Sequence, residues 1–240
     1  MKANYSIKTN PDKNELEFLK KWLSVEYKKY GTGFFCNWNI IKKSFSENRL
    51  IIFQEDKSPI GFIVWRKSKI YVDIDIMEIH PEKRKLGLGK IFYHILQNFF
   101  LDQEFKAFKL FCDPSESEIF WRKMGFIDFP ETGYVQHDLT LYKPIIDIAK
   151  CRSDLDIITK LELWNTEPHQ SKFTKPMWTW DLHSNTTEFE KPIFSPCNPN
   201  WMIRLTIDGH VIKEGKVKYF QLKDQILFDP FIYIDKPNFA

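Results

Sequence analysis

The sequence predicts a mixed α/β (α+β) domain, in which helices flank a central sheet with a bulged strand, followed by a smaller β-rich domain. Residues 70–79 alternate apolar and polar side chains with the period of a strand. Residues 88–99 carry apolar side chains at helical spacing. After about residue 165, prolines and short alternating segments replace the helical patterns. We therefore expect a first domain over 1–145 and a second over 146–240.

The chain is expected to begin with a short strand and two helices. Residues 5–8 have the alternation of a strand. Asn10 followed by Pro11 predicts a helix start, because proline suits the first helical position. An apolar helical face then continues to the glycines of segment 31–33, which should end the helix. A shorter helix is expected over 37–47.

Three strands should follow, the first two over 50–54 and 60–66, joined by the hairpin sequence E-D-K-S-P. The third, over 70–79, changes phase along its length. Its valine and isoleucines at 72, 74 and 76 share one face, and its aspartates at 73 and 75 share the other. Met77 and Ile79 then take the phase of the aspartates. Such a slip is typical of a β-bulge, which we expect near residues 77–79.

A glycine-bearing turn joins this strand to the next helix, with Arg84, Gly87 and Gly89 at R-x-x-G-x-G spacing. Glycines let backbone N–H groups approach a bulky anion, and the first helical turn adds unpaired donors and partial positive charge. The pattern predicts a pyrophosphate cradle. The flanking cations are Lys83, Arg84, Lys85 and Lys90. A dinucleotide fingerprint is excluded because Phe92 stands where its third glycine belongs, and no P-loop sequence is present.

A strand over 105–112, a helix ending at Met124–Gly125 and a final strand over 134–143 complete the first domain. The helix start offers two alternative capping boxes, Asp113 with Glu116 or Ser115 with Glu118.

The run H-P-E-K-R-K-L-G-L-G-K, followed about thirty residues later by F-W-R-K-M-G-F, resembles the two signatures of the GCN5-related N-acetyltransferases. The family pattern [QR]-x-x-G-x-[GA] falls on Arg84, Gly87 and Gly89, between a bulged strand and a helix. The resemblance covers roughly residues 1–143. It implies the family's mixed sheet, acetyl-CoA (coenzyme A) as cofactor, and transfer of an acetyl group by direct attack of an amine.

The resemblance also implies which residues bind the cofactor. They are Met77, Glu78, Ile79, Arg84, Lys85, Leu86, Gly87, Leu88, Gly89 and Lys90, with Ser117 and Trp121 on the later helix. The early helical region would wall the acceptor site, where Phe34, Phe35 and Trp38 are candidates for lining it or for packing the core. The acceptor is expected to be an amine of a small molecule or peptide.

The catalytic base stays open among three carboxylates of one strand. Asp73 aligns with the glutamate that the histone-type members use, and Asp75 and Glu78 are alternatives. The acid is in question because Trp121 stands where the family often has tyrosine, and an indole N–H has no usable acidic pKa. Either another hydroxyl such as Ser117 or Tyr93 protonates the leaving thiolate, or the thiolate leaves as an anion, or turnover is lost. The alternative function is therefore an acyl-CoA-binding regulatory module without turnover.

The composition sets bounds on other functions. A net charge of +3 over 240 residues, with no arginine-rich block, gives no indication of nucleic-acid binding. The four cysteines form no C-x-x-C pair and the six histidines have no metal-ligand spacing, so reduced thiols and no metal site are expected. No run approaches the about 20 apolar residues of a membrane span, and the first residues lack a signal-peptide core. We expect a soluble, cytoplasmic protein, with homodimerisation left open.

The second part of the chain belongs to no family that we recognise. Residues 154–164 fit a helix or a strand, whereas 201–207 alternate clearly and Asp208-Gly209 predicts a hairpin turn. Further strands are expected over 211–213, 217–220 and 226–234. The tryptophans at 164, 178, 180 and 201 fit a small core that needs large side chains, or else a ligand-binding wall.

Overall fold

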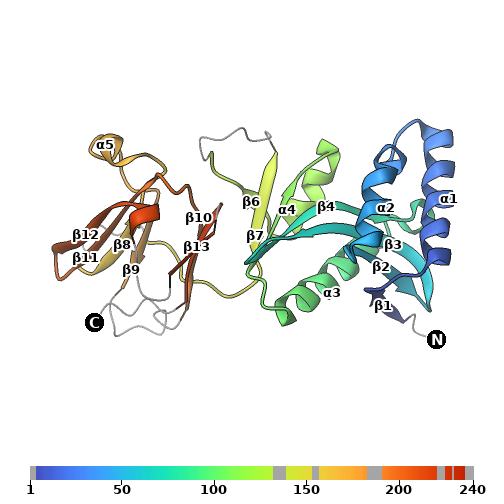
Figure 1. Cartoon of the computed structure of the whole chain (residues 1–240), viewed down its shortest axis with the longest axis horizontal. Helices are drawn as coiled ribbons and strands as arrows, with labels where there is room; N and C mark the ends of the chain where they lie inside the picture. Colours follow the sequence, from blue (N-terminus) through green and yellow to red (C-terminus); the bar gives the residue numbers. More distant parts are fainter. Residues whose placement is uncertain are drawn as a thin grey trace. The chain divides into compact units, whose positions relative to one another are not determined.

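Figure 1 presents a computed structural model of the chain, which describes residues 4–131, 139–152, 157–182, 191–220, 225–228 (backbone only) and 230–235. The chain divides into two compact units. The first consists of Met1–Asp128 and Leu139–Ile145, and the second of Phe129–Asp138 and Ile146–Ala240. That these units are two domains with separate roles stays a prediction.

The first unit is built on a mixed seven-stranded sheet, as the sequence predicts. In spatial order its strands are β1 (Tyr5–Lys8), β2 (Leu50–Glu55), β3 (Ser58–Lys67), β4 (Tyr71–Ile79), β5 (Ala107–Phe111), β7 (Thr140–Pro144) and β6 (Ile127–Asp128). Strands β4 and β5 run parallel, and the other paired strands run antiparallel. The mixed α/β class is therefore confirmed.

Helices cover both faces of this sheet (Figure 1). On one face lie α1 (Lys13–Tyr30) and α2 (Trp38–Ser46), which follows the 3₁₀ turn η1 (Phe34–Asn37). On the other lie α3 (Leu88–Asp102) and α4 (Glu118–Lys123), preceded by the turns η2 (Pro81–Lys83) and η3 (Ser115–Ser117). Two separate apolar clusters result. Leu19, Leu23 and Ile41 pack against Phe62 and Ile76 on the first face, and Phe92, Leu96 and Trp121 pack with Phe53 and Ile74 on the second.

The bulge of β4 lies at Asp75, so its predicted position near residues 77–79 is wrong. Val64 of β3 pairs with Ile76, and the next residue, Trp65, pairs with Ile74, which leaves Asp75 as the extra residue. Ile74 therefore faces the α3 cluster, whereas Ile76 faces α1 and α2. The sequence pattern misplaces the slip because Ile76 and Met77 are both apolar, so either position satisfies the alternation.

Helix α1 begins two residues later than the start predicted from Asn10 and Pro11, at a capping box formed by Asp12 and Glu15. Oδ1 of Asp12 accepts hydrogen bonds from the N–H groups of Asn14 (2.8 Å) and Glu15 (3.1 Å), and Oε2 of Glu15 accepts from the N–H of Asp12 (2.8 Å). An Asn10 cap would have Lys13 at the third helical position, which offers no acceptor to the N–H of the cap residue, whereas Glu15 accepts from the N–H of Asp12. The predicted end at Gly31 is confirmed: its φ is 70° and its N–H donates to Tyr27.

Neither predicted capping box forms at the start of α4. The 3₁₀ turn η3 occupies the segment instead, and no side chain caps η3 or α4. The expected strand over 134–143 is observed from Thr140, because residues 132–138 lie outside the described part. Strand β6 was not predicted, since two residues are too few to show alternation.

The second unit is β-rich, as predicted. One sheet has the order β12 (His210–Lys216), β11 (Met202–Ile207), β8 (Lys160–Leu163) and β9 (Trp178–Asp181). The other has the order β10 (Ile193–Pro196), β14 (Phe231–Ile234) and β13 (Gln225–Phe228), and a short helix α5 spans Pro168–Ser171. The strand expected over 217–220 is wrong, because Val217–Tyr219 forms a 3₁₀ turn that buries Val217 and Phe220 together in the core.

The core of the second unit accounts for most of its tryptophans. Trp164, Trp180 and Trp201 are buried, and Trp178 stacks on Trp201 with ring centroids 5.8 Å apart. This supports the core-filling interpretation. Within the described part, no helix combines the length and apolar content that a bilayer crossing requires, and no group of His, Cys, Asp or Glu side chains has the arrangement of a metal site. All four cysteines are free thiols.

Candidate functional site

A cavity opens in the first unit where two parallel strands separate. Strand β4 pairs with β5 only from Tyr71 opposite Ala107 to Ile74 opposite Leu110, and it then continues to Ile79 paired with β3 alone. The cavity has a volume of about 800 Å³. Its lining comes from Ile74–Ile79 of β4, Lys83–Lys90 without Leu86, several residues between Leu110 and Met124, and Phe34 of η1. The separation of the strands therefore provides the space between their ends.

The turn before α3 presents unpaired backbone donors to this cavity. Lys85 and Gly87 have left-handed φ angles of 63° and 78°, and Gly87 is the N-cap of α3. Backbone hydrogen bonds resume at Lys90, which donates to the Gly87 carbonyl. The five N–H groups from Lys85 to Gly89 donate no hydrogen bond within the described residues. Together with the positive end of α3, they form a site suited to an anion.

Gly89 leaves room that a side chain would fill. A Cβ atom at this position would lie 3.3 Å from Cε2 of Phe120 and 3.9 Å from Cγ1 of Ile79, both of which line the cavity. The glycine thus lets a ligand approach the first turn of α3 closely. Leu86 is 65% exposed and its side chain does not line the cavity, so any contribution it makes is through its backbone.

Not all predicted cations are available to an anion. Lys85 and Lys90 line the cavity, as does Lys123 of α4, and none of the three has a carboxylate partner within the described residues. Lys83 is paired with Glu55 at 2.6 Å. Arg84 also lines the cavity, but its Nε and Nη2 atoms donate to protein oxygens, which leaves Nη1 as the part of the guanidinium without an acceptor among the described residues.

Arg84 joins strand β4 to helix α1. Its Nε donates to the carbonyl of Ile79 (2.9 Å), and its Nη2 donates to Oε1 of Glu26 (2.6 Å) and Oε1 of Glu78 (3.0 Å). The Glu78 side chain is 17% exposed, and its Oε1 also accepts from the N–H of Ile79 (2.9 Å). Burial raises the pKa of Glu78, although Arg84 opposes the effect. Glu78 is therefore a buried carboxylate at the cavity wall.

The two aspartates of β4 are placed differently. Asp75, the bulged residue, lines the cavity and is paired with Nε of Arg66. Burial raises the pKa of Asp75, and Arg66 opposes the effect. Asp73 is not among the lining residues, and its carboxylate lies 3.5 Å from Nζ of Lys109 and 3.9 Å from Nη2 of Arg66. The structure thus brings Asp75 and Glu78 together at the cavity and leaves Asp73 outside its lining.

The backbone of β4 has donors on the side where β5 has ended. The N–H of His80 donates to the carbonyl of Ile60 in β3. N–H groups at every second residue of a strand point to the same side, so the N–H of Glu78 also points toward β3. Since these directions alternate along a strand, the N–H groups of Met77 and Ile79 point away from β3. That of Ile79 is taken by Glu78, which leaves Met77 N–H as the donor facing the gap.

The α4 side of the cavity carries an indole and a hydroxyl. Trp121 is 7% exposed and packs against Phe120 and Phe126. The Ser117 hydroxyl donates to the carbonyl of Pro114 (2.8 Å) and lies 3.2 Å from Sγ of Cys112. Tyr93 is not among the lining residues, its hydroxyl has no hydrogen-bond partner, and burial raises its pKa far above the usual range. Of the two hydroxyls considered from the sequence, Ser117 alone reaches the cavity wall.

Among residues proposed for the acceptor side, Phe34 lines the cavity, whereas Phe35 and Trp38 pack on the α1–α2 cluster. The sequence prediction missed Glu26. A signal was present, because Glu26 falls seven residues after Leu19 and three after Leu23, on the apolar face of α1. A charged residue at such a position usually has a buried partner.

No protein-family model matches the chain. An uncharacterised N-acetyltransferase, ycf52 of Porphyra purpurea, is 34% identical over 95 residues, which are 39% of this chain and 48% of the relative. The match thus spans about half the length of this curated relative. Similar solved structures include the PaiA N-acetyltransferase of Thermoplasma acidophilum in complex with coenzyme A (16% identity, 59% of this chain and 99% of that chain, TM-score 0.45). Tetrahymena GCN5 is another (15% identity, 60% and 96%, TM-score 0.45). The resemblance of the N-terminal part to N-acetyltransferases is confirmed.

Proposed function

We propose that the chain, which resembles N-acetyltransferases in its N-terminal part, is an acetyl-CoA-dependent N-acetyltransferase acting on an amine. One observation carries the proposal: the five N–H groups from Lys85 to Gly89 donate no hydrogen bond within the described residues, and four of these five residues line a cavity of about 800 Å³ beside the separated strands. A diphosphate needs such a row of donors at a helix N-terminus. An extended thioester arm needs the gap between β4 and β5, where no strand pairs with Met77 on the side opposite β3.

The residues present fit coenzyme A in charge as well as in shape. Lys85, Lys90 and Lys123 would attract its phosphates, and the space beside Gly89 would admit the diphosphate. The cofactor, when bound, supplies an acetyl group activated as a thioester. Met77 N–H would hold the carbonyl oxygen of that group, a role that requires a preorganised donor.

Glu78 is the preferred proton acceptor for the attacking amine. A general base works best when its pKa lies near the working pH, and burial raises the pKa of Glu78 toward that range. Asp75 is a weaker candidate because its carboxylate is paired with Arg66 alone, which stabilises the charged form. Asp73 is the weakest of the three, because its side chain is not among those that line the cavity and it is paired with Lys109. Ser117 is the hydroxyl best placed to donate a proton to the departing thiolate.

The acceptor is proposed to be an amine of a small molecule or peptide that enters beside Phe34. This ring belongs to η1, between α1 and α2, and it lines the same cavity as Asp75 and Glu78 of β4. Asp75 is paired with Arg66, and Arg84 is shared between Glu26 and Glu78. These groups together carry an excess of one carboxylate, which is less negative charge than a polycationic acceptor would need. We therefore expect acceptors that do not depend on polycationic character.

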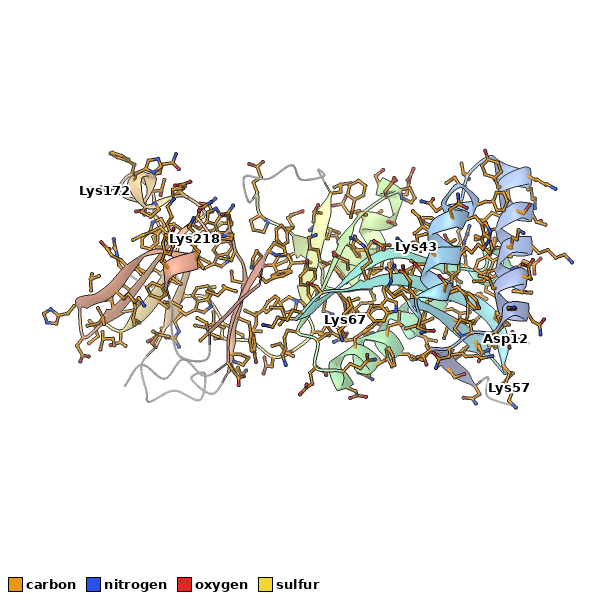
Figure 2. The ribbon with its side chains drawn as sticks, in the orientation of Figure 1. Asp12, Lys43, Lys57, Lys67, Lys172 and Lys218 are labelled. Atoms are coloured by element: carbon orange, nitrogen blue, oxygen red, sulfur yellow. The ribbon has the colours of Figure 1, made fainter. Side chains whose placement is uncertain are left out.

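Calorimetric titration with coenzyme A tests the binding half of the proposal. The wild-type protein should bind, and the double variant Lys85→Gln/Lys90→Gln should bind about tenfold more weakly, with a smaller salt dependence. The matched control is Lys43→Gln/Lys57→Gln. These two lysines, marked in Figure 2, do not line the cavity, so the control should bind like wild type. No binding by the wild-type protein would refute the proposal.

Release of free coenzyme A from acetyl-CoA, corrected for hydrolysis and measured with a panel of amines, tests the catalytic half. Release that depends on one class of amine supports the enzyme. Tight binding without release for any amine would favour the second candidate, an acyl-CoA-binding regulatory module. The observation in favour of that candidate is Trp121, an indole without a usable acidic pKa at the position where the family often has tyrosine.

A further inference from the structure

Glu26 is a buried carboxylate whose two oxygens both accept hydrogen bonds, and its residue lines a second cavity of about 450 Å³ bounded by α1 and residues 80–82. Its side chain is 6% exposed. Its Oε1 accepts from Arg84 (2.6 Å), and its Oε2 accepts from the indole Nε1 of Trp22 (3.2 Å). The backbone of Gly33 lies so close that a Cβ there would be 3.5 Å from the carboxyl carbon of Glu26. Glu26 therefore has one position, and it holds Arg84 in one position too.

This arrangement gives one guanidinium two carboxylates to neutralise. The same Nη2 atom of Arg84 lies 2.6 Å from Glu26 and 3.0 Å from Glu78. The closer and more buried carboxylate is the one outside the cavity, and the more distant one is at the cavity wall. A buried ion cluster with an excess carboxylate favours proton uptake by one of its members. Glu78 is the member that lines the cavity of the candidate site, whereas Glu26 lines the second cavity.

The other groups around Glu78 do not change this balance. His80 follows two residues later, and burial lowers its pKa, which favours the neutral imidazole. Lys83 lines the same cavity but is paired with Glu55. Lys85 lines the cavity from the turn, and on β3 the residue opposite Glu78 is the uncharged Phe62. Arg84 and Glu26 are thus the charged groups in direct or shared contact with Glu78.

We propose that Glu26 is a positioning residue of the candidate acetyltransferase site: by occupying one side of Arg84, it keeps Glu78 aimed at the cavity and only partly neutralised, as a proton acceptor must be. The role in catalysis rests on the proposed function. The physical coupling of Glu26 to Glu78 does not, and it can be measured without any acceptor.

The substitution Glu26→Gln tests the coupling because it keeps the shape and a hydrogen-bond acceptor for Trp22 while removing the charge. Glu78 is then the one carboxylate paired with Arg84, so the pKa of Glu78 should fall by about 1 unit. Glu55→Gln is the matched control. It removes a carboxylate paired at 2.6 Å with Lys83, the residue next to Arg84, and should leave Glu78 unchanged.

The first measurement follows the carbon-13 carboxyl resonance of Glu78, identified by its loss in Glu78→Gln, as pH is varied. A midpoint lower in Glu26→Gln than in wild type, and unchanged in Glu55→Gln, supports the proposal. An unchanged midpoint in a folded Glu26→Gln protein overturns it, whatever the transfer assays give.

The second measurement is the pH dependence of kcat/KM for transfer from acetyl-CoA. In Glu26→Gln the acidic limb should move by about 1 unit to lower pH, and the plateau should fall by about threefold, because a less basic carboxylate accepts a proton less well. A plateau that falls without movement of the limb would mean that Glu26 only supports packing, which contradicts the proposal. If the wild-type protein transfers acetyl groups to no amine, the proposed function fails, and the resonance measurement alone decides the role of Glu26.

Discussion

The Nε atom of Arg66 lies 2.9 Å and 3.0 Å from the two carboxylate oxygens of Asp75, the residue that forms the bulge in β4. The Arg66 side chain is 59% exposed, so this pair is partly solvated. Glu78, three residues along the same strand, instead shares Arg84, whose side chain is 39% exposed, with the buried Glu26. The two carboxylates at the cavity therefore have different electrostatic surroundings, which gives them different expected roles.

Replacing these carboxylates one at a time should separate their roles. We expect Glu78→Gln to lower kcat/KM by about 100-fold, because loss of a general base has effects of this order. Asp75→Asn should lower it by less than about tenfold, because its carboxylate is neutralised by Arg66. Steady-state rates, with calorimetric affinities for coenzyme A as the control for binding, provide the measurement. A larger loss of kcat/KM in Asp75→Asn than in Glu78→Gln would identify Asp75 as the general base.

Gly61 of β3 is required by the close approach of β4. A Cβ atom there would lie 2.8 Å from the backbone oxygen of Glu78 and 2.9 Å from Cδ1 of Ile79. Because a backbone oxygen in a paired strand cannot move freely, Gly61→Ala should destabilise the first unit by about 1–3 kcal/mol. It should also displace the strand segment that carries Met77.

Hydrogen exchange of the β3 and β4 amides in Gly61→Ala checks this expectation. Ser58→Ala, at the exposed start of the same strand, serves as the control and should exchange like wild type. Unchanged protection of the β4 amides in Gly61→Ala would show that β3 and β4 can accommodate the added methyl group without loss of stability, which would contradict this expectation.

Tyr93 has a hydroxyl that is buried without a hydrogen-bond partner, surrounded by Phe108 and Phe126. Removing an unsatisfied buried polar group can be neutral or stabilising. We expect Tyr93→Phe to leave the unfolding free energy unchanged or to raise it by about 1 kcal/mol, and to leave acetyl transfer within about twofold, because Tyr93 does not line the cavity. Thermal denaturation and steady-state rates measure both. A large loss of rate with intact stability would instead identify Tyr93 as the missing acid.

Periodicity predicted most of the first unit because its elements are long and amphipathic. The strand at residues 5–8, the helix that starts at Leu88 and the end of α1 at Gly31 are observed where the sequence indicates them. The glycine turn was predictable for a related reason: φ angles near 78° at Gly87 and a close approach at Gly89 leave few alternatives to glycine. Local chemistry determines these features, so a single sequence reveals them.

Features that depend on contacts between distant segments were not predictable. The bulge lies at Asp75 because of its pairing with β3, which the alternation of β4 alone cannot reveal. The ion pair that holds Arg84 depends on Glu26, which is 58 residues away in sequence. The short strands and turns of the second unit carry too few residues to show a period, so the 3₁₀ turn at Val217–Tyr219 was taken for a strand.

The cap of α1 should give a pH-dependent contribution to the stability of this helix. Hydrogen bonding to the backbone N–H of Glu15, and then to Lys8, lowers the pKa of Asp12, which Figure 2 marks at the start of α1. A lowered pKa means that the stabilisation is present above the usual pKa of an aspartate and is lost as pH falls through the lower pKa of the folded state. At pH 7, Asp12→Ala should therefore increase amide exchange in the first turns of α1 by about fivefold, whereas Glu17→Ala, on the exposed side of the same helix, should have little effect. The difference between Asp12→Ala and wild type should shrink below about pH 4, and a difference that stays constant down to pH 3 would mean that the charge of Asp12 does not contribute to the cap.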